Sequence, residues 1–325
     1  MAKPSIYIDG QEGTTGLRIR TMLERRQDLE LLLIPAAQRK DTGTRRSFLN
    51  RADLVILCLP DEAATEALEL IDNPATRIID TSTIRRINPG WVYGLPELGP
   101  GQREAIVKAD RVANCGCYPV GFTLAVRPLI QAGLLDPGAQ FTINAISGYS
   151  GGGRKMIEAY GQAPRPDRSN DAALPLSLYS LGESHKHVPE MQAFGLLEHP
   201  PLFVPSVAHT YCGMLVSTPL TAAHGINAAT TAQAIHAVWQ ACYRDAPFVR
   251  PVAPTDSEQG LREGKFLDPG ECNFTNRVEL FVFGNPAGGL LLVGRLDNLG
   301  KGASGNAVQC LNLMLGFDEK TGLST

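Results

Sequence analysis

Residues 5–17 read Ser-Ile-Tyr-Ile-Asp-Gly-Gln-Glu-Gly-Thr-Thr-Gly-Leu, and this stretch decides the fold. Ser5 to Ile8 is β-branched and aromatic and therefore predicts a strand, which Asp9-Gly10 ends. Apolar residues at helical spacing follow from Leu17 to Leu23. A strand, a glycine turn and a helix in this order are typical of a loop that cradles a dinucleotide's pyrophosphate at the helix N-terminus. The spacing G-x-x-G-x-x-G also fits an ordinary glycine-rich turn.

Further strand and helix signals follow in the first third of the chain. Asp53 to Leu59 is a nearly continuous apolar strand, which is the pattern of a parallel sheet buried on both faces. An alanine-rich helix is predicted from Pro60 to about Ile71, Arg77 to Asp80 is another strand, and Trp91 to Glu97 reads as a turn-rich link. Repeated β-α units predict an α/β fold whose first domain, residues 1–116, is a Rossmann-type parallel sheet.

The end of the second predicted strand, Leu29 to Ile34, indicates which dinucleotide is bound. NAD-preferring sites usually carry an acidic residue there, which binds the ribose 2′-hydroxyl. This chain carries Arg39 and Lys40 instead, with two more arginines at 45–46. Positive charge at this place suits a 2′-phosphate, so we expect NADP as the cofactor. The alternative is that Arg39 and Lys40 are solvated loop charges.

The segment Asn114-Cys-Gly-Cys-Tyr-Pro-Val-Gly121 holds the candidate nucleophile. The apolar run 122–129 predicts a helix, and Pro119 suits its first turn because the missing N–H costs nothing there. Cys117 would then lie at the helix N-terminus, where unpaired amides and the macrodipole favour a thiolate. The alternative is that Cys115 and Cys117 are small buried apolar residues.

Three arginines are candidates for holding an anionic substrate. Arg85 and Arg86 follow a predicted strand end, and ligands of open α/β sheets bind beyond such carboxyl ends. Arg154 closes the glycine-rich run 147–154, whose amides could wrap a phosphate or an oxyanion. Ordinary surface charges, and a flexible connection at 147–154, are the alternatives.

Two histidines, His185 and His187, are the candidates for proton transfer. They lie between carboxylates in the run 183–190, and a carboxylate beside a histidine fixes its tautomer and suits it to proton transfer. Residues two apart point oppositely in an extended chain, so we expect one ring to face the site and the other to turn away.

The second half of the chain reads as an α+β catalytic and oligomerisation domain over residues 117–298, with a largely antiparallel sheet. A polar, proline-bearing loop is expected at 164–175, and a helix at 306–315 is expected to return the segment 299–325 to the first domain. The strands predicted in this half are 139–147, 202–207, 213–220, 277–282 and 289–295. An amphipathic helix is predicted at 230–243.

Composition narrows the class of protein. A net charge of −3 offers no basic field for nucleic acid. No apolar stretch approaches the ~20 residues that span a bilayer. Seven cysteines, an odd number placed mostly inside apolar runs, indicate a reducing cytoplasm. No second ligand pair accompanies Cys115-Gly-Cys117 at a usable spacing, so we expect no metal site.

Together these segments resemble the shorter subfamily of the N-acetyl-γ-glutamyl-phosphate reductases, within the wider aspartate-semialdehyde and glyceraldehyde-phosphate dehydrogenase group. The resemblance covers essentially the whole chain and is carried by Gly10 to Gly16, Tyr93-Gly-Leu-Pro-Glu-Leu98, Asn114-Cys-Gly-Cys-Tyr-Pro119, Ser147 to Arg154, His185-Lys-His-Val-Pro-Glu190 and Asp297 to Gly305. It implies Cys117 as the catalytic cysteine and His185 and His187 as the proton-transfer region, with Glu190 beside them. The cofactor contacts that it implies are Gly10, Gly13, Thr14, Thr15, Gly16, Ser150, Gly151 and Asn298.

The reaction implied by this resemblance is an NADPH-dependent reductive dephosphorylation in arginine biosynthesis. N-acetyl-L-glutamyl 5-phosphate, a small acyl phosphate, would form a thioester on Cys117 in a homo-oligomer, a dimer or a tetramer. One alternative is a reductase of another acyl phosphate, of the aspartyl or aminoadipyl type. The other is a nucleotide-binding regulator that keeps the fold and has lost the chemistry. The residues alone leave open which histidine moves the proton and which arginine holds the substrate.

Overall fold

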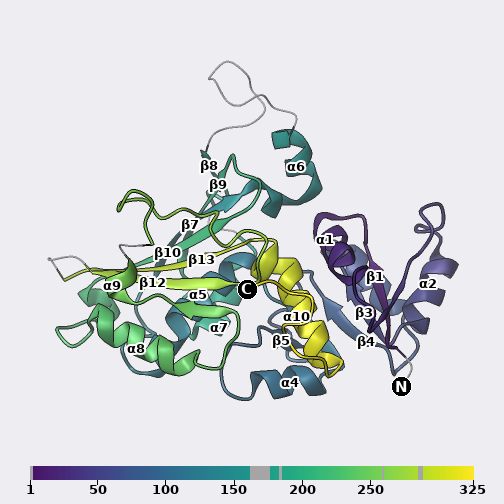
Figure 1. Cartoon of the computed structure of the whole chain (residues 1–325), viewed down its shortest axis with the longest axis horizontal. Coiled ribbons are helices and arrows are strands. Elements are labelled where there is room, and N and C mark those ends of the chain that lie inside the picture. Colours follow the sequence, from purple (N-terminus) through teal and green to yellow (C-terminus); the bar gives the residue numbers. More distant parts are fainter. Residues whose placement is uncertain (1–2, 162–175, 183–184, 258–259, 285–287) are drawn as a thin grey trace. The chain divides into compact units, whose positions relative to one another are not determined.

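The computed structural model describes residues 3–161, 176–182, 185–257, 260–284 and 288–325 (Figure 1). The loop expected at 164–175 lies outside these described residues. The chain divides into two compact units. The first unit comprises Met1–Pro96, Pro100–Cys115 and Ala303–Ser324, and the second comprises Glu97–Gly99, Gly116–Gly302 and Thr325.

A six-stranded sheet forms the centre of the first unit, with the strand order β2-β1-β3-β4-β6-β5. All of its neighbouring strands are parallel. Every residue of Leu54–Leu57 is buried, as the continuous apolar pattern predicts for a sheet covered on both faces. The strands are β1 (Ser5–Asp9), β2 (Glu30–Leu32), β3 (Leu54–Leu57), β4 (Arg77–Asp80), β5 (Val92–Gly94) and β6 (Arg111–Asn114).

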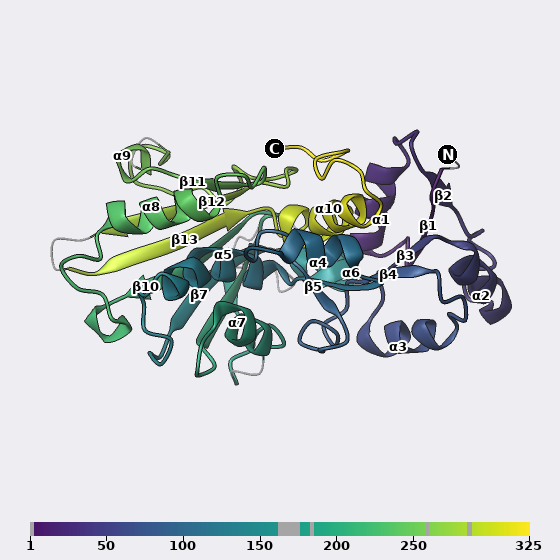
Figure 2. The ribbon, with the colours of Figure 1, turned by 90° about the horizontal axis from the view of Figure 1, so that it is seen from below.

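Helices pack on both faces of this sheet (Figure 2). One face carries α1 (Thr14–Leu23), α4 (Gln102–Lys108) and α10 (Gly305–Met314), and the other carries α2 (Thr42–Arg51) and α3 (Asp61–Glu69). Alternate residues of β1 supply the two cores, because Ile6 and Ile8 pack with α1 and α10 whereas Tyr7 packs on the α2 side. The predicted Rossmann-type layering is therefore confirmed.

A seven-stranded mixed sheet forms the second unit, with the order β11-β12-β13-β10-β7-β9-β8. The pairs β7–β9 and β11–β12 are parallel and the other neighbours are antiparallel. The strands are β7 (Thr142–Gly148), β8 (Leu176–Leu178), β9 (Leu202–Ala208), β10 (Met214–Leu220), β11 (Val249–Pro251), β12 (Val278–Gly284) and β13 (Leu290–Leu296). The helices are α5 (Cys117–Gln131), α6 (Gly153–Gly161), α7 (Val188–Gly195), α8 (Ala232–Cys242) and α9 (Pro254–Ser257). The 3-10 helices η1 (Tyr149–Gly152) and η2 (Ala222–His224) and the π-helix η3 (Gly300–Ser304) are short.

Helix α5 packs against β10 and β13 through glycine. A Cβ built on Gly294 would lie 2.9 Å from the Gly121 Cα, so the two backbones approach as closely as glycine allows. The helix begins at Cys117, five residues before the predicted apolar run, because Gly116 is extended (φ −81°, ψ 153°) and Pro119 fits the first turn. Among the described helices, none has both the length and the apolar character needed to cross a membrane.

Candidate active site

The glycine loop after β1 leads directly into the N-terminus of α1 in the first unit. Helix α1 starts at Thr14, and its N-cap residue Gly13 makes no side-chain capping bond, so the first-turn amides have no acceptor from a capping side chain. A Cβ on Gly16 would lie 2.3 Å from the Gly10 carbonyl oxygen. Gly10 has φ +91°, and its own Cβ would lie 2.3 Å from the Cys58 carbonyl oxygen. The tight turn and the open helix start thus both depend on glycine.

The basic residues after β2 are placed differently from one another. Arg39 and Lys40 are exposed. Arg45 instead donates from Nη2 to Asp9 Oδ2 over 2.7 Å, at the end of β1, in a pair that is mostly buried. The charge of Arg45 is therefore balanced by Asp9, whereas Arg39 and Lys40 face solvent.

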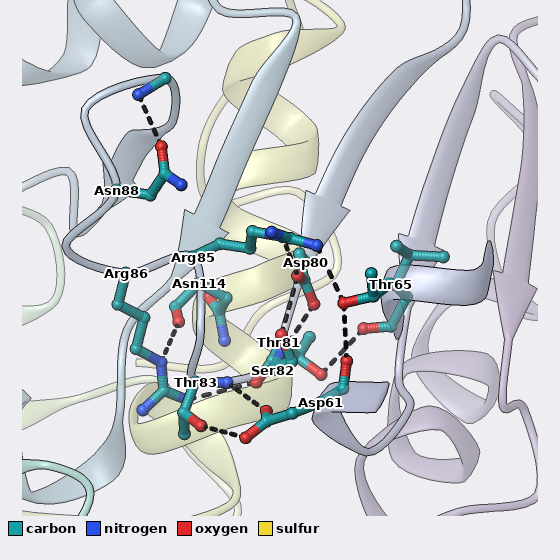
Figure 3. Close-up of polar contacts among 12 residues, drawn as sticks. Asp61, Thr65, Asp80, Thr81, Ser82, Thr83, Arg85, Arg86, Asn88 and Asn114 are labelled. Atoms are coloured by element: carbon teal, nitrogen blue, oxygen red, sulfur yellow. Dashed lines mark hydrogen bonds and ion pairs between the residues drawn. The ribbon is translucent and has the colours of Figure 1, made fainter. Parts of the chain in front are cut away.

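The segment after β4 holds Arg85 and Arg86 by polar contacts within the first unit (Figure 3). Arg85 donates from Nη2 to Thr65 Oγ1 over 3.0 Å, and its Nε lies 3.9 Å from Asp80 Oδ2. Arg86 is buried and donates from Nε to the Asn114 carbonyl oxygen over 2.9 Å. Burial raises the pKa of the Asp80 carboxyl, against hydrogen bonds from Ser82 and the charges of both arginines. The two guanidiniums therefore order the strand ends of β4 and β6.

Cys117 is the first residue of α5 and is partly exposed, whereas Cys115 is 1% exposed. The preceding amide of Gly116 donates to Glu190 Oε1 over 2.7 Å, and Glu190 is buried. On another side, a Cβ built on Gly302 would lie 2.7 Å from the Cys117 Cβ. Glu190 from α7 and Gly302 from η3 thus fix the backbone that carries the thiol.

The expectation that His185 and His187 point to opposite sides is wrong. Their ring centroids lie 4.7 Å apart. Residues 185–187 form a turn rather than extended chain: Val188 N donates to the His185 carbonyl oxygen, and His187 is the helical N-cap of α7 (φ −86°, ψ −10°). The turn brings both rings edge-on to Tyr118, with centroids at 5.6 Å and 5.8 Å.

Two tyrosines that the sequence interpretation did not single out join this group. The hydroxyls of Tyr118 and Tyr179 lie 2.8 Å apart, and Tyr179 Oη lies 3.4 Å from His185 Nε2. Burial raises the pKa of both phenols, and the charge of Cys117 adds to the rise in each. Tyr118 follows Cys117 directly and could have been noticed, whereas no pattern in the sequence marks Tyr179.

A third cluster in the second unit joins Ser150, Gly151 and Asn298. Asn298 donates from Nδ2 to Ser150 Oγ over 2.9 Å and accepts from the Gly213 amide over 3.0 Å. A Cβ on Gly151 would lie 3.5 Å from the same Nδ2. Arg154, in contrast, is 72% exposed and pairs with Glu158 one helical turn on.

Comparison with known proteins adds the family. The chain is 48% identical over 324 residues to N-acetyl-gamma-glutamyl-phosphate reductase 2 of Nostoc sp., covering 99% of this chain and 100% of that protein. It belongs to the N-acetyl-gamma-glutamyl-phosphate reductase family. The enzyme of that name from Rhizobium etli (strain ATCC 51251) is 46% identical, over 96% of this chain and 99% of its own length.

Residues 117–298 match the family model of the semialdehyde dehydrogenase dimerisation domain. Aspartate semialdehyde dehydrogenase II of Vibrio cholerae has a similar fold, with a TM-score of 0.71 at 16% identity over 97% of this chain and 99% of that one. The family resemblance inferred from the motifs is therefore confirmed. Within the described residues no group of histidine, cysteine and carboxylate side chains could hold a metal ion.

Proposed function

We propose that this enzyme reduces N-acetyl-L-glutamyl 5-phosphate to N-acetyl-L-glutamate 5-semialdehyde with release of phosphate, using NADPH, in cytoplasmic arginine biosynthesis. The names of relatives 46–48% identical over nearly the full chain support the substrate. One observation carries the chemistry: Cys117 opens α5 and is partly exposed, and the residue after it, Tyr118, contacts both histidine rings. The dimerisation-domain match supports a homo-oligomer, a dimer or a tetramer.

The first unit offers a suitable place for the dinucleotide. The amides of Thr14, Thr15 and Gly16 at the uncapped start of α1 would bind the pyrophosphate, and Gly10 and Gly13 leave room for it. The buried Oε1 of Gln11 beside the loop has no hydrogen-bond partner among the described residues, which fits a polar ligand there. The exposed Arg39 and Lys40 would meet a 2′-phosphate.

In the second unit, Ser150, Gly151 and Asn298 would complete the binding of the cofactor. The two contacts of Asn298 fix its side-chain amide against Ser150 and Gly213. When bound, the nicotinamide supplies the hydride. We propose domain limits at 1–116 and 117–298, with a returning segment 299–325. With these limits, the two groups of cofactor contacts belong to different domains.

Cys117 begins the reaction as a thiolate, after a histidine takes its proton. The sulfur attacks the acyl carbon, the bond from that carbon to the phosphate oxygen breaks, and phosphate leaves with a thioester formed. The first amides of α5 would hold the oxyanion, a contribution of about 3 kcal/mol per donor. After reduction at the thioester carbon, the hemithioacetal collapses to the aldehyde, and the histidine returns the proton to the departing sulfur.

The arginines would hold the anionic ends of the substrate. We place Arg86 first, because the carbonyl oxygens of Thr81 and Asn114 fix its guanidinium. Asn114 ends β6 and lies three residues before Cys117 in the chain. Arg85 is the second candidate, because its Nε lies 3.9 Å from Asp80 Oδ2 and the carboxylate balances part of its charge. Arg154 comes last, because its charge is paired with Glu158 at the surface.

The reverse reaction provides the test: phosphate-dependent oxidation of N-acetylglutamate semialdehyde, followed as reduction of NADP. Activity should exceed that with aspartate semialdehyde or an aminoadipate semialdehyde. Cys117→Ser should abolish it and leave NADPH binding intact, whereas the matched Cys115→Ser should retain it. Preference for another aldehyde would overturn the substrate, and an active Cys117→Ser enzyme would overturn the thioester. Arg39→Ala should weaken NADPH binding and leave NADH binding unchanged; equal effects on both would remove the 2′-phosphate contact.

A further inference from the structure

The geometry points to a division of labour between the two histidines, set by a pair of tyrosines. We propose that Tyr118 and Tyr179 are positioning residues that hold His185 neutral and fixed, and that His187 transfers the proton. This inference rests on the proposed function.

The tautomer of His185 follows from a main-chain donor. The His187 amide donates to His185 Nδ1 over 3.1 Å. An amide N–H can only donate, so Nδ1 must present its lone pair, and the hydrogen of a neutral ring is on Nε2. Nε2 lies 3.4 Å from Tyr179 Oη and donates to it.

The hydrogen bonds link three side chains in a row. Tyr179 Oη accepts from His185 Nε2 and shares a second hydrogen bond with Tyr118 Oη, 2.8 Å away, in which either hydroxyl can be the donor. Both phenols keep their protons, because burial raises the pKa of each. Aromatic contacts hold the His185 ring from two further sides, with centroids at 5.1 Å from Phe203 and 5.6 Å from Tyr118.

A histidine held in this way is a poor proton carrier. Accepting a proton at Nδ1 would break the bond from the His187 amide, and the Nε2 hydrogen of a neutral imidazole is not acidic at neutral pH. Keeping His185 neutral also benefits its neighbour. The two rings are 4.7 Å apart, and a second positive charge at that distance would disfavour protonation of His187.

The titratable groups around the two rings come from four segments. Cys117 and Tyr118 lie on α5, Glu190 lies on α7 and binds the Gly116 amide, and Tyr179 follows β8. The exposed Lys186 lies between the histidines in the chain, and β9 contributes the uncharged Phe203. A pH profile of the variants therefore has to be read against a thiol, an amine, a carboxylate and two phenols.

Substitution by glutamine separates the two roles. The glutamine amide can still donate toward Tyr179, so His185→Gln should retain kcat within about tenfold. His187→Gln removes the proton carrier and should lower kcat by about 100- to 10,000-fold. The limb of the pH profile that reports the proton donor should persist in His185→Gln and vanish in His187→Gln. The opposite pattern would overturn the assignment.

The tyrosines are tested by removing their hydroxyls. Tyr179→Phe and Tyr118→Phe should each lower kcat about tenfold with little change in KM. The double variant should have nearly the same kcat as either single variant, because one substitution already interrupts the row of hydrogen bonds. Tyr243→Phe is the matched control: it removes a buried hydroxyl that donates to the Leu124 carbonyl oxygen on the same α5, and kcat should not change. Independent losses in the double variant, or an equal loss in the control, would refute the positioning role.

A nitrogen-15 NMR spectrum of the histidine-labelled enzyme reports the tautomer without any assay of activity. The His185 signals, identified by their absence from His185→Gln, should be those of the Nε2–H form, and Tyr179→Phe should shift them. A protonated ring or the Nδ1–H form at neutral pH would overturn the inference even in an active enzyme. An inactive wild-type enzyme with the expected tautomer would instead count against the proposed function alone.

Discussion

The contact between Gly302 and Cys117 makes a sharp prediction about the nucleophile. In Gly302→Ala the new Cβ would lie 2.7 Å from the Cys117 Cβ and 3.2 Å from the Cys117 Cα. Non-bonded carbon atoms rest at about 3.5–4.0 Å, so the two segments must separate by about 1 Å. A misplacement of about 1 Å at a reacting group costs about 100-fold in rate.

Neither side of this contact can yield easily. The Gly302 amide donates to the Asp297 carbonyl oxygen over 3.0 Å. The Asp297 carboxylate in turn accepts from the amides of Leu299 and Phe274, over 2.8 Å and 2.7 Å. Cys117 is held by α5 and, through the Gly116 amide, by Glu190. We therefore expect the strain to displace the thiol and to cost about 1–3 kcal/mol of stability, as overpacking does.

The assay compares kcat for aldehyde oxidation with the rate of iodoacetamide alkylation of Cys117, at a temperature where urea unfolding shows the variant folded. Gly284→Ala is the control, because its Cβ would meet Leu290 Cδ2 at an ordinary 3.5 Å. We expect kcat to fall about 100-fold in Gly302→Ala and to stay unchanged in Gly284→Ala. A folded Gly302→Ala enzyme with the wild-type kcat and alkylation rate would refute the reasoning.

Three further predictions concern buried charge. Lys301→Met should lower the free energy of unfolding by about 4 kcal/mol in urea titrations, because it removes the cation from a fully buried 2.6 Å ion pair with the Glu97 carboxylate. A variant as stable as the wild type would contradict this. Glu190→Gln keeps an acceptor for the Gly116 amide and should lower the free energy of unfolding by about 1 kcal/mol. Glu190→Leu leaves that amide unsatisfied and should lower it by about 2 kcal/mol more. Equal losses of stability in the two variants would argue against the contact. Burial raises the pKa of Asp80, so the stability this carboxyl contributes is fully present below an unfolded pKa of about 3.9 and is lost as pH rises through the native pKa. Wild-type unfolding free energy should therefore decline relative to Asp80→Asn as pH is raised from about 3.5 to neutrality, and parallel curves would contradict the shift.

Much of the fold could be predicted because the patterns that specify it are local. Continuous apolar residues mark β3, and the strands β9, β10, β12 and β13 begin and end within a residue or two of their predicted limits. The motifs also identified the family. The glycine loop could be located for the same reason, since strand, turn and helix signals follow one another within twenty residues.

Elements without a strong apolar stripe were missed. Helix α2 buries only Leu49 and starts on an Asp41 side chain that caps the Thr44 amide, so it shows little hydrophobic periodicity. Strand β5 is three residues long at the edge of its sheet, and its Gly94 and the following prolines favour a turn. Helix α4 is short and buries only Ile106. In each case long-range packing outweighs a weak local signal.

Residues far apart in the sequence determine the immediate surroundings of Cys117. Glu190 holds the amide before it and lies 73 residues away in the chain, whereas Gly302 limits the space beside it and lies 185 residues away. Tyr179 reaches the same group through the hydroxyl of Tyr118. Glutamate, glycine and tyrosine are common residues, and nothing in their local sequence shows that they act together. Their common effect is to fix the start of one helix, so the position of the thiol is specified by the packing of the second unit and the identity of the nucleophile by the local motif.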